Sequence, residues 1–453
     1  MIDLTKGKES KLILHFATPM LLGNIFQQLY NVVDSVIVGH YIGKEALAAV
    51  GASFPFIFLV ISMVIGIASG TTIIIAQYFG ARDFKSIIRA IDTMYIFLFF
   101  ASIILSLLGI LFCEQILELI KLPADVLPQA KIYLTIFLSG LIFFFGFNGT
   151  SAILRGLGDS KTPLFFLIIS TIINIILDLL FVIVFKWGIT GVAVATIISQ
   201  AVAFFIAIIY LNRTHAIINL SFRKLVFDRS IFSKSTKIGI PSGLQQTFVA
   251  LGMIALFRIV NDFGTDTIAA YSVAIRINSF AVLPAMNFSA ALSTFVGQNL
   301  GANKPERVKK GYKATFLMAS MISLSVSALV LIFPASLFGM FTPEQNIIDI
   351  GVSYLMIAGP FYILFSTMFI TQGVLRGAGD TLIPMFITLF TLWIVRVPIS
   401  YFLSQKIGFV GIWWGFPFAW MTGMILSYLY YLTGRWKSKV VVKYPITLND
   451  IKE

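Results

Sequence analysis

Two acidic residues, Asp34 and Asp178, lie deep within long apolar stretches, whereas the other eighteen acids fall in polar segments or near the ends of such stretches. An ionised side chain at the centre of a bilayer costs about 2.5 to 3.5 kcal/mol on translocon-insertion scales, so such residues normally face a protein interior or an aqueous cavity. We therefore expect both acids to mark an ion or substrate path. A purely structural buried hydrogen bond is the alternative interpretation.

The polar residues near Asp178 suit the handling of a cation. Asn174 precedes Asp178 by one helical turn, so its amide shares a helix face with the carboxylate. At about 1.5 Å per residue, Thr196 on the next stretch has a membrane depth that matches those of Asp34 and Asp178. Carboxylate, amide and hydroxyl oxygens can ligate a sodium ion or relay a proton. We favour protons, because only two carboxylates would compensate the dehydration of sodium.

The first apolar stretch carries a polar stripe that leads to Asp34. Gln27, then Tyr30 or Asn31, and then Asp34 follow the three-to-four spacing of one helix face. Interhelical hydrogen bonding is the alternative role for the neutral members of this stripe. Earlier in the same stretch, Pro19 removes a backbone hydrogen bond, which predicts a helix bend.

Composition identifies the class of protein that must position these residues. Hydrophobic residues make up 58% and charged residues 12% of the 453 positions, whereas a soluble globular chain carries about 25% charged residues. We predict an all-α integral membrane protein, because the apolar stretches have the length of membrane-spanning helices and lack β-barrel alternation. The net charge of +13 collects in short polar segments, which membrane orientation explains better than nucleic-acid binding. A single cysteine, Cys113, and three scattered histidines predict no metal site and no cofactor.

Twelve membrane-spanning helices are expected. Lysine and arginine crowd alternate connections, which predicts a multi-pass protein of the cell membrane with both termini in the cytoplasm. The expected spans are about 12–38, 47–78, 90–112, 128–154, 162–185, 189–212, 236–260, 267–299, 311–333, 346–374, 382–404 and 409–433.

The chain contains an internal duplication. LRGLGD, which begins at Leu154, returns 221 positions later as LRGAGD, and AQYFGA at Ala76 returns as GQNLGA at the same shift. We predict two six-helix pseudo-symmetric lobes around a central cavity, residues 1–222 and 223–453, joined by a cytoplasmic linker at about 212–237. Asp178 has the apolar counterpart Ile399, so we place the chemistry in the first lobe.

The second half instead contains embedded arginines. We expect Arg258 to extend to the outer surface, and carbonyls or helix ends to satisfy Arg276 and Arg396, with a direct substrate role as the less favoured alternative. Asp159 and Asp380 end the repeated motifs, where we expect each to cap the helix that follows.

From about Pro19 to the last span, the sequence resembles the multidrug and toxic compound extrusion (MATE) family. The shared features are twelve helices in two lobes, LRGLGD with LRGAGD, and the glutamine-glycine pairs at 77–80 and 298–301. Asp34, Asn174, Asp178 and Thr196 match the branch with a cation-coupling site in the N-terminal lobe. Gln27, Tyr30, Tyr133 and Asn148 align with cavity-lining positions of that branch. Leu179 replaces a proline that follows the acid in some members, and 255–257 lack the acids of the branch that couples through the other lobe.

The resemblance implies a function in export. It predicts a monomeric antiporter that moves bulky amphiphilic, mainly cationic, small molecules across the lipid bilayer in exchange for protons or sodium ions. The nearest alternative is a flippase for lipid-linked intermediates, for which Arg276 and Arg396 could hold a phosphate. An embedded enzyme is not expected, because the histidines do not supply a nucleophile and base or a metal cluster.

Overall fold

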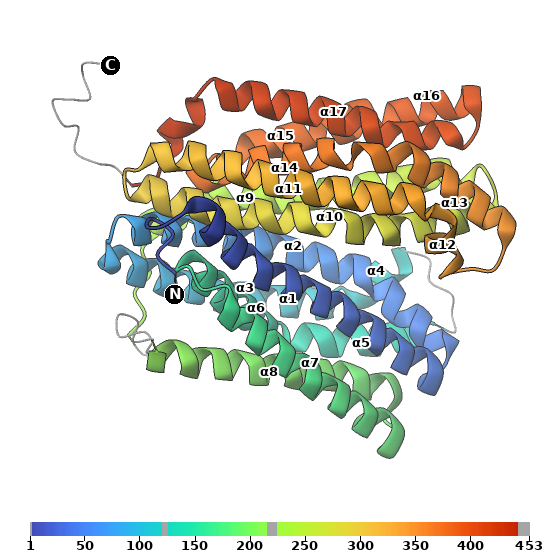
Figure 1. Ribbon diagram of the computed structural model, residues 1–453. Helices are drawn as coiled ribbons and strands as arrows, with labels where there is room; N and C mark the ends of the chain where they lie inside the picture. The colour runs from blue at the N-terminus through green and yellow to red at the C-terminus, as the bar shows by residue number, and fades with distance from the viewer. Residues whose placement is uncertain (1, 120–125, 215–223, 443–453) are drawn as a thin grey trace. The chain divides into compact units, whose positions relative to one another are not determined.

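The structure, a computed structural model, describes residues 2–119, 126–214 and 224–442, and these ranges contain helices and turns but no strand (Figure 1). Nine helices within the described ranges are long and apolar enough to cross a membrane. The pair α5 (Leu127–Ser139) and α6 (Leu141–Gly156), bent by 52°, is a tenth candidate span. The predicted class, an all-α integral membrane protein, is confirmed.

The helices follow the predicted segments in order. The remaining elements of the first half are α1 (Glu9–Ile37), η1 (Val38–Ile42), α2 (Lys44–Gly80), α3 (Phe84–Leu111), α4 (Cys113–Leu119), α7 (Lys161–Leu179), η2 (Leu180–Val184) and α8 (Gly188–Thr214). The second half contains α9 (Arg229–Asn261), α10 (Thr265–Gly301), α11 (Pro305–Ile332), α12 (Pro334–Gly339), α13 (Gln345–Ala358), η3 (Gly359–Phe361), α14 (Tyr362–Ala378), α15 (Leu382–Leu389), η4 (Phe390–Arg396), α16 (Val397–Ile407), α17 (Val410–Leu432) and η5 (Arg435–Lys439).

Four predicted spans are interrupted where the sequence predicts continuous helices. The span 128–154 bends between α5 and α6, and 346–374 contains the 3₁₀ turn η3. The spans 162–185 and 382–404 contain the π-helical turns η2 and η4. Each interruption changes the backbone hydrogen bonding while the segment stays apolar, so hydropathy gives no sign of it.

The chain divides into two compact units whose limits cut through helices. Unit 1 consists mainly of His15–Thr72 and Lys85–Thr247, and unit 2 of Asp3–Leu14, Ile73–Phe84 and Phe248–Glu453. Helices α1, α2, α9 and, by its first residue, α3 therefore contribute residues to both units. The predicted lobes 1–222 and 223–453 stay a prediction, and part of the predicted linker, 215–223, lies outside the described residues.

Within unit 2, the repeated glutamine-glycine motif brings two helix ends together. A Cβ atom on Gly80 would overlap the backbone carbonyl of Gln298, and one on Gly301 would overlap that of Gln77. The last turns of α2 and α10 consequently meet backbone to backbone, which only glycine permits at both positions. This reciprocal contact gives the duplicated motif a packing role.

The two glutamines of the motif also bind segments near opposite ends of the chain. Gln77 accepts a hydrogen bond from the Val441 backbone N–H (2.7 Å), and Gln298 accepts one from that of Leu4 (3.0 Å). The Gln77 amide donates to the Gly377 carbonyl (3.0 Å), within the second LRGxGD motif. Both copies of the glutamine-glycine motif and the second copy of the LRGxGD motif thus belong to one network in unit 2.

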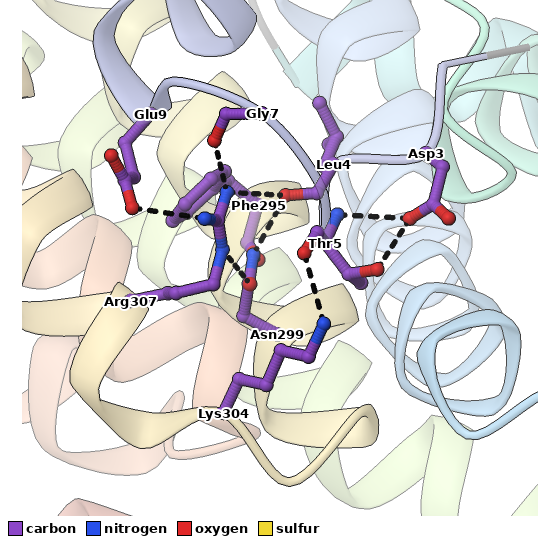
Figure 2. A network of polar contacts seen from close by, with 9 residues as sticks. All are labelled: Asp3, Leu4, Thr5, Gly7, Glu9, Phe295, Asn299, Lys304 and Arg307. Atoms are coloured by element: carbon purple, nitrogen blue, oxygen red, sulfur yellow. Dashed lines mark hydrogen bonds and ion pairs between the residues drawn. The ribbon is translucent and has the colours of Figure 1, made fainter.

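Arg307 on α11 fixes the segment that precedes α1, as Figure 2 shows. Its four partners are the Gly7 carbonyl (2.9 Å), the Asn299 side-chain oxygen (2.9 Å), the Glu9 carboxylate (3.0 Å) and the Leu4 carbonyl (3.5 Å). Lys304 adds a hydrogen bond to the Thr5 carbonyl (3.1 Å). These charge-assisted contacts hold Asp3–Glu9 in one conformation on unit 2.

The LRGxGD motifs form turns that lead into the next helix. Gly158 and Gly379 have φ of +86° and +98°, in the left-handed region that favours glycine. Asp159 then accepts hydrogen bonds from the backbone N–H (3.0 Å) and hydroxyl (2.7 Å) of Thr162, in the first turn of α7. Its counterpart Asp380 accepts a hydrogen bond from the Tyr430 hydroxyl (2.6 Å) instead. Asp159 therefore caps a helix as expected, whereas Asp380 joins its turn to α17.

Candidate functional site

A polar stripe runs along the buried face of α7 and ends at Asp178. Ser170, Asn174 and Asp178 follow one another at intervals of four residues, and their exposed fractions are 3%, 1% and 0%. Neither the Asn174 side chain nor the Asp178 carboxylate has a hydrogen-bond partner among the described residues. Buried polar atoms without partners are unusual, so this end of α7 is a candidate place for an ion or ligand.

The structure brings Asp34 of α1 to Asp178. The two carboxyl groups lie close enough that a proton on one acid would be hydrogen-bonded by the other. Asp34 is only 9% exposed, and no basic side chain among the described residues forms an ion pair with either acid. Two negative charges in one buried pocket repel each other. The pair therefore favours the uptake of a proton or a metal cation.

Aromatic and hydroxyl side chains complete this cluster in unit 1. Tyr30 on α1 and Tyr133 on α5 both lie within electrostatic range of the two acids, and Tyr30 also faces Thr196 on α8. The Thr196 hydroxyl donates to the Val192 carbonyl (3.0 Å), so its oxygen is free to act as an acceptor. Four helices, α1, α5, α7 and α8, thus each contribute one side chain or more.

Each acid lies shortly before a π-helical turn. Asp34 is followed by η1 and Asp178 by η2, and the two turns contact each other. π-Helical turns interrupt the regular backbone ladder and occur frequently at functional sites. Leu179 lacks the helix-breaking ring of proline, yet the helix is distorted directly after this residue.

Other predicted residues contribute less to the cluster. Asn148 donates to the Phe144 carbonyl of its own helix (2.9 Å), and no contact of its side chain with either acid is seen in the described residues. Asn31 is exposed, so Tyr30 and not Asn31 belongs to the face of Asp34. Gln27 is half-buried, and Pro19 is buried within the unbroken helix α1. The roles assigned to these residues stay predictions.

Two further polar residues near the cluster were not predicted from the sequence. Ser170 continues the buried stripe of α7, and the side-chain oxygen of Gln200 is buried without a partner one turn beyond Thr196 on α8. Both lie four residues from a predicted site residue. This spacing was the signal that could have found them.

The corresponding elements of unit 2 contain no acid pair. Leu256 lies fully buried in an apolar core, in the segment where related transporters of the other branch were expected to carry acids. Arg258 and Arg276 are both exposed. The described residues contain no group of three or more His, Cys, Asp or Glu side chains that could hold a metal ion.

Relatives of this chain are named as multidrug resistance or multidrug export proteins. The probable multidrug resistance protein YpnP of Bacillus subtilis is 31% identical over 437 residues, which cover 96% of this chain and 98% of the relative. The probable multidrug resistance protein YoeA of the same organism is 33% identical over 440 residues and 94% of each chain. The multidrug export protein MepA of Staphylococcus aureus is 22% identical over 415 residues and 90% of each chain.

Solved structures share the fold. An outward-facing multidrug resistance MATE family transporter of the MOP superfamily matches with a TM-score of 0.89 at 24% identity, over 96% of this chain and 98% of that chain. A MATE transporter in the bent conformation matches with a TM-score of 0.90 at 24% identity, over 96% and 97% of the two chains. The MatE family model matches residues 19–180 and again 241–402, in agreement with the internal duplication. The chain therefore belongs to the MatE family, the multidrug and toxic compound extrusion transporters.

Proposed function

We propose that this protein is a secondary active antiporter that exports amphiphilic, mainly cationic, small molecules by alternating access. A cation that enters the cell drives export by binding to Asp34 and Asp178. The observation that carries this proposal is the pair of buried carboxyl groups in mutual contact with no basic partner among the described residues.

A proton suits this pair better than sodium. One proton shared between two carboxyl groups removes their repulsion and satisfies an oxygen of each. Sodium prefers several oxygen ligands, and Asn174 and Thr196 are the neutral oxygens available to complete such a set. Only two carboxylates would then compensate the loss of the hydration shell, so we favour the proton and keep sodium as the alternative.

The aromatic residues beside the acids favour cationic substrates. Tyr133 stacks on Phe137, with ring centroids 6.4 Å apart, and both Tyr133 and Tyr30 lie near the carboxyl groups. An aromatic face attracts a cation by about 0.5 to 2 kcal/mol. A lipophilic cation would therefore compete with the driving proton for the negative charge. Competition of this kind couples export to proton entry.

Export of a lipid-linked phosphate is supported less well. The relatives are named for multidrug resistance or multidrug export. The acids of unit 1 would repel a phosphate. We further propose a monomer in the cell membrane with both termini in the cytoplasm, as the distribution of lysine and arginine indicates.

The decisive experiment imposes one gradient at a time. Purified protein in proteoliposomes is given a pH gradient without sodium, or a sodium gradient at equal pH, and ethidium transport is recorded. We expect the pH gradient alone to drive transport and Asp178→Asn to abolish this response. Transport driven only by sodium would overturn the proton assignment, and no transport of ethidium with either gradient would count against drug export.

A further inference from the structure

Arg396 in unit 2 is an embedded cation, and the described part of the chain supplies no carboxylate as its partner. Its guanidinium carbon lies 3.5 Å from the centroid of the Phe416 ring, and its Nε atom is buried without a hydrogen-bond partner. No carboxylate among the described residues forms an ion pair with it. An aromatic face thus covers the guanidinium, and its ε N–H has no hydrogen-bond partner among the described residues. The expectation that carbonyls or helix ends satisfy Arg396 stays a prediction.

Among the described residues, tyrosine hydroxyls around Arg396 also lack hydrogen-bond partners of good geometry, although that of Tyr271 lies near the guanidinium. Tyr271 of α10 and Tyr354 of α13 are each 1% exposed, lie within electrostatic range of Arg396, and have hydroxyl groups without a partner of good geometry. Tyr362 of α14, 2% exposed and beside Tyr354, has another unpaired hydroxyl. Three helices thus point unsatisfied hydroxyls into one part of the unit 2 core.

Aromatic rings make the walls of this cluster. Tyr271 stacks on Trp413 with ring centroids 5.7 Å apart, and Tyr354 meets Trp413 edge to face at 5.5 Å. The Trp413 indole N–H is already used, because it donates to the Ser353 hydroxyl (3.0 Å). The polar groups that remain for a ligand are the guanidinium and the tyrosine hydroxyls.

These groups favour a ligand that accepts hydrogen bonds. A guanidinium only donates hydrogen bonds, and a tyrosine hydroxyl donates as readily as it accepts. A ligand that accepts from all of them and carries negative charge satisfies every unpaired donor at once. One fixed positive charge matches a monovalent anion. The close packing of the surrounding rings further favours a compact ion.

The backbone adds an independent indication. Among the described residues three π-helical turns occur, and two of them follow the acids of unit 1. The third, η4, ends at Arg396 itself. Since such turns are frequent at functional sites, the distortion singles out Arg396 without reference to its side-chain contacts.

We propose that Arg396, Tyr271 and Tyr354 form a binding site for a small monovalent anion of the halide class within unit 2. The site is separate from the acid pair in unit 1 and does not depend on which cation drives transport. Arg396 is half-buried, and its Nε atom is fully buried. The bound anion neutralises an otherwise uncompensated charge in the core of the unit.

The test compares chloride with gluconate in the detergent-purified full chain. Sodium chloride replaces sodium gluconate at constant sodium and ionic strength, while the midpoint of thermal unfolding and tryptophan fluorescence are recorded. We expect the midpoint to rise with chloride and to saturate, and bromide to act like chloride. An anomalous-diffraction peak beside Arg396 in bromide-soaked crystals is expected as well. A wild-type protein that responds equally to chloride and gluconate would overturn the proposal.

Single substitutions test whether the response to chloride comes from the cluster around Arg396. We expect Arg396→Gln to lose the chloride response, while Arg276→Gln, which alters an exposed arginine of α10, keeps it. Should Arg396→Gln fail to fold, Tyr354→Phe removes a single hydroxyl and is expected to weaken chloride binding about tenfold. An unchanged chloride affinity in Tyr354→Phe and a normal response in any folded Arg396→Gln would each contradict the site. Asp178→Asn should keep the chloride response, so failure of the transport proposal and failure of the anion site are distinguishable.

Discussion

Asp34 and Asp178 form a pair of buried acids that lie close to each other. Asp178 is fully buried, neither of its oxygens has a partner among the described residues, and the adjacent acid carries the same charge. A protein core normally avoids such an arrangement, because like charges in a low dielectric repel strongly. Its presence in a transporter is understandable if a cation binds and leaves in each cycle.

We predict that Asp34→Asn and Asp178→Asn each reduce proton-driven ethidium efflux to background without loss of expression. Asparagine preserves the shape of the side chain but cannot take up and release a proton. Efflux from loaded cells and the amount of protein in the membrane are measured side by side. Asp262→Asn, at an exposed acid, is the matched control and should retain efflux. Wild-type efflux in either site variant would exclude that acid from coupling.

Spacing and depth located most of this cluster at the level of residues. The four-residue interval placed Asn174 and Asp178 on one helix face, and this is what the structure has. Contact between Asp34 and Asp178 did not follow from the sequence, because equal depth on two helices does not determine how those helices are rotated. For the same reason the sequence left Tyr30 and Asn31 as alternatives. Whether the cluster couples transport stays a prediction.

At the scale of elements, glycine determines how closely helices approach. In unit 2, α2 and α10 meet at Gly80 and Gly301, where no Cβ atom fits. At Gly51, earlier in α2, an added Cβ atom would instead meet open space. One helix therefore contains a glycine that packing requires and another that packing does not require.

We predict opposite effects for alanine at these two glycines. Gly80→Ala should lower the free energy of unfolding by about 1 to 3 kcal/mol, because the added methyl group overlaps a backbone carbonyl that cannot move aside. Gly51→Ala should be neutral or stabilising by up to about 1 kcal/mol, since alanine has the higher helix propensity. Thermal and denaturant unfolding of the purified variants measures both. Equal stability of the two variants would contradict the close contact of α2 and α10.

Helix positions were more predictable than helix breaks. Apolar length located the spans, because burial in a bilayer imposes it on every spanning helix. The bend of 52° between α5 and α6 and the π-helical turns η1, η2 and η4 were missed. These features depend on which carbonyl accepts the hydrogen bond of each backbone N–H. The residues before and after each interruption are equally apolar. Only packing against neighbouring helices determines that choice.

For the whole molecule, the sequence predicted the internal duplication but not the division of the chain into two compact units. Repeated motifs at a constant shift predicted two copies of one architecture, and the MatE family model matches both. The limits of the two compact units, however, fall inside α1, α2, α3 and α9. A helix that contributes to two units has no composition change at the point of division, so the sequence contains no signal there. The segment Asp3–Leu14 consequently belongs to unit 2, although the rest of α1 belongs to unit 1.

We predict that the contacts of Arg307 keep the segment Asp3–Leu14 packed on unit 2. Arg307→Ala removes its contacts with Gly7, Asn299 and Glu9 and should lower the free energy of unfolding by about 3 kcal/mol. Hydrogen exchange at the Leu4 amide should accelerate, because its bond to Gln298 depends on the segment staying in place. Lys309→Ala on the same helix breaks only an exposed ion pair and should change the stability by less than about 0.5 kcal/mol. If both variants exchange and unfold alike, the network drawn in Figure 2 does not hold the segment in solution.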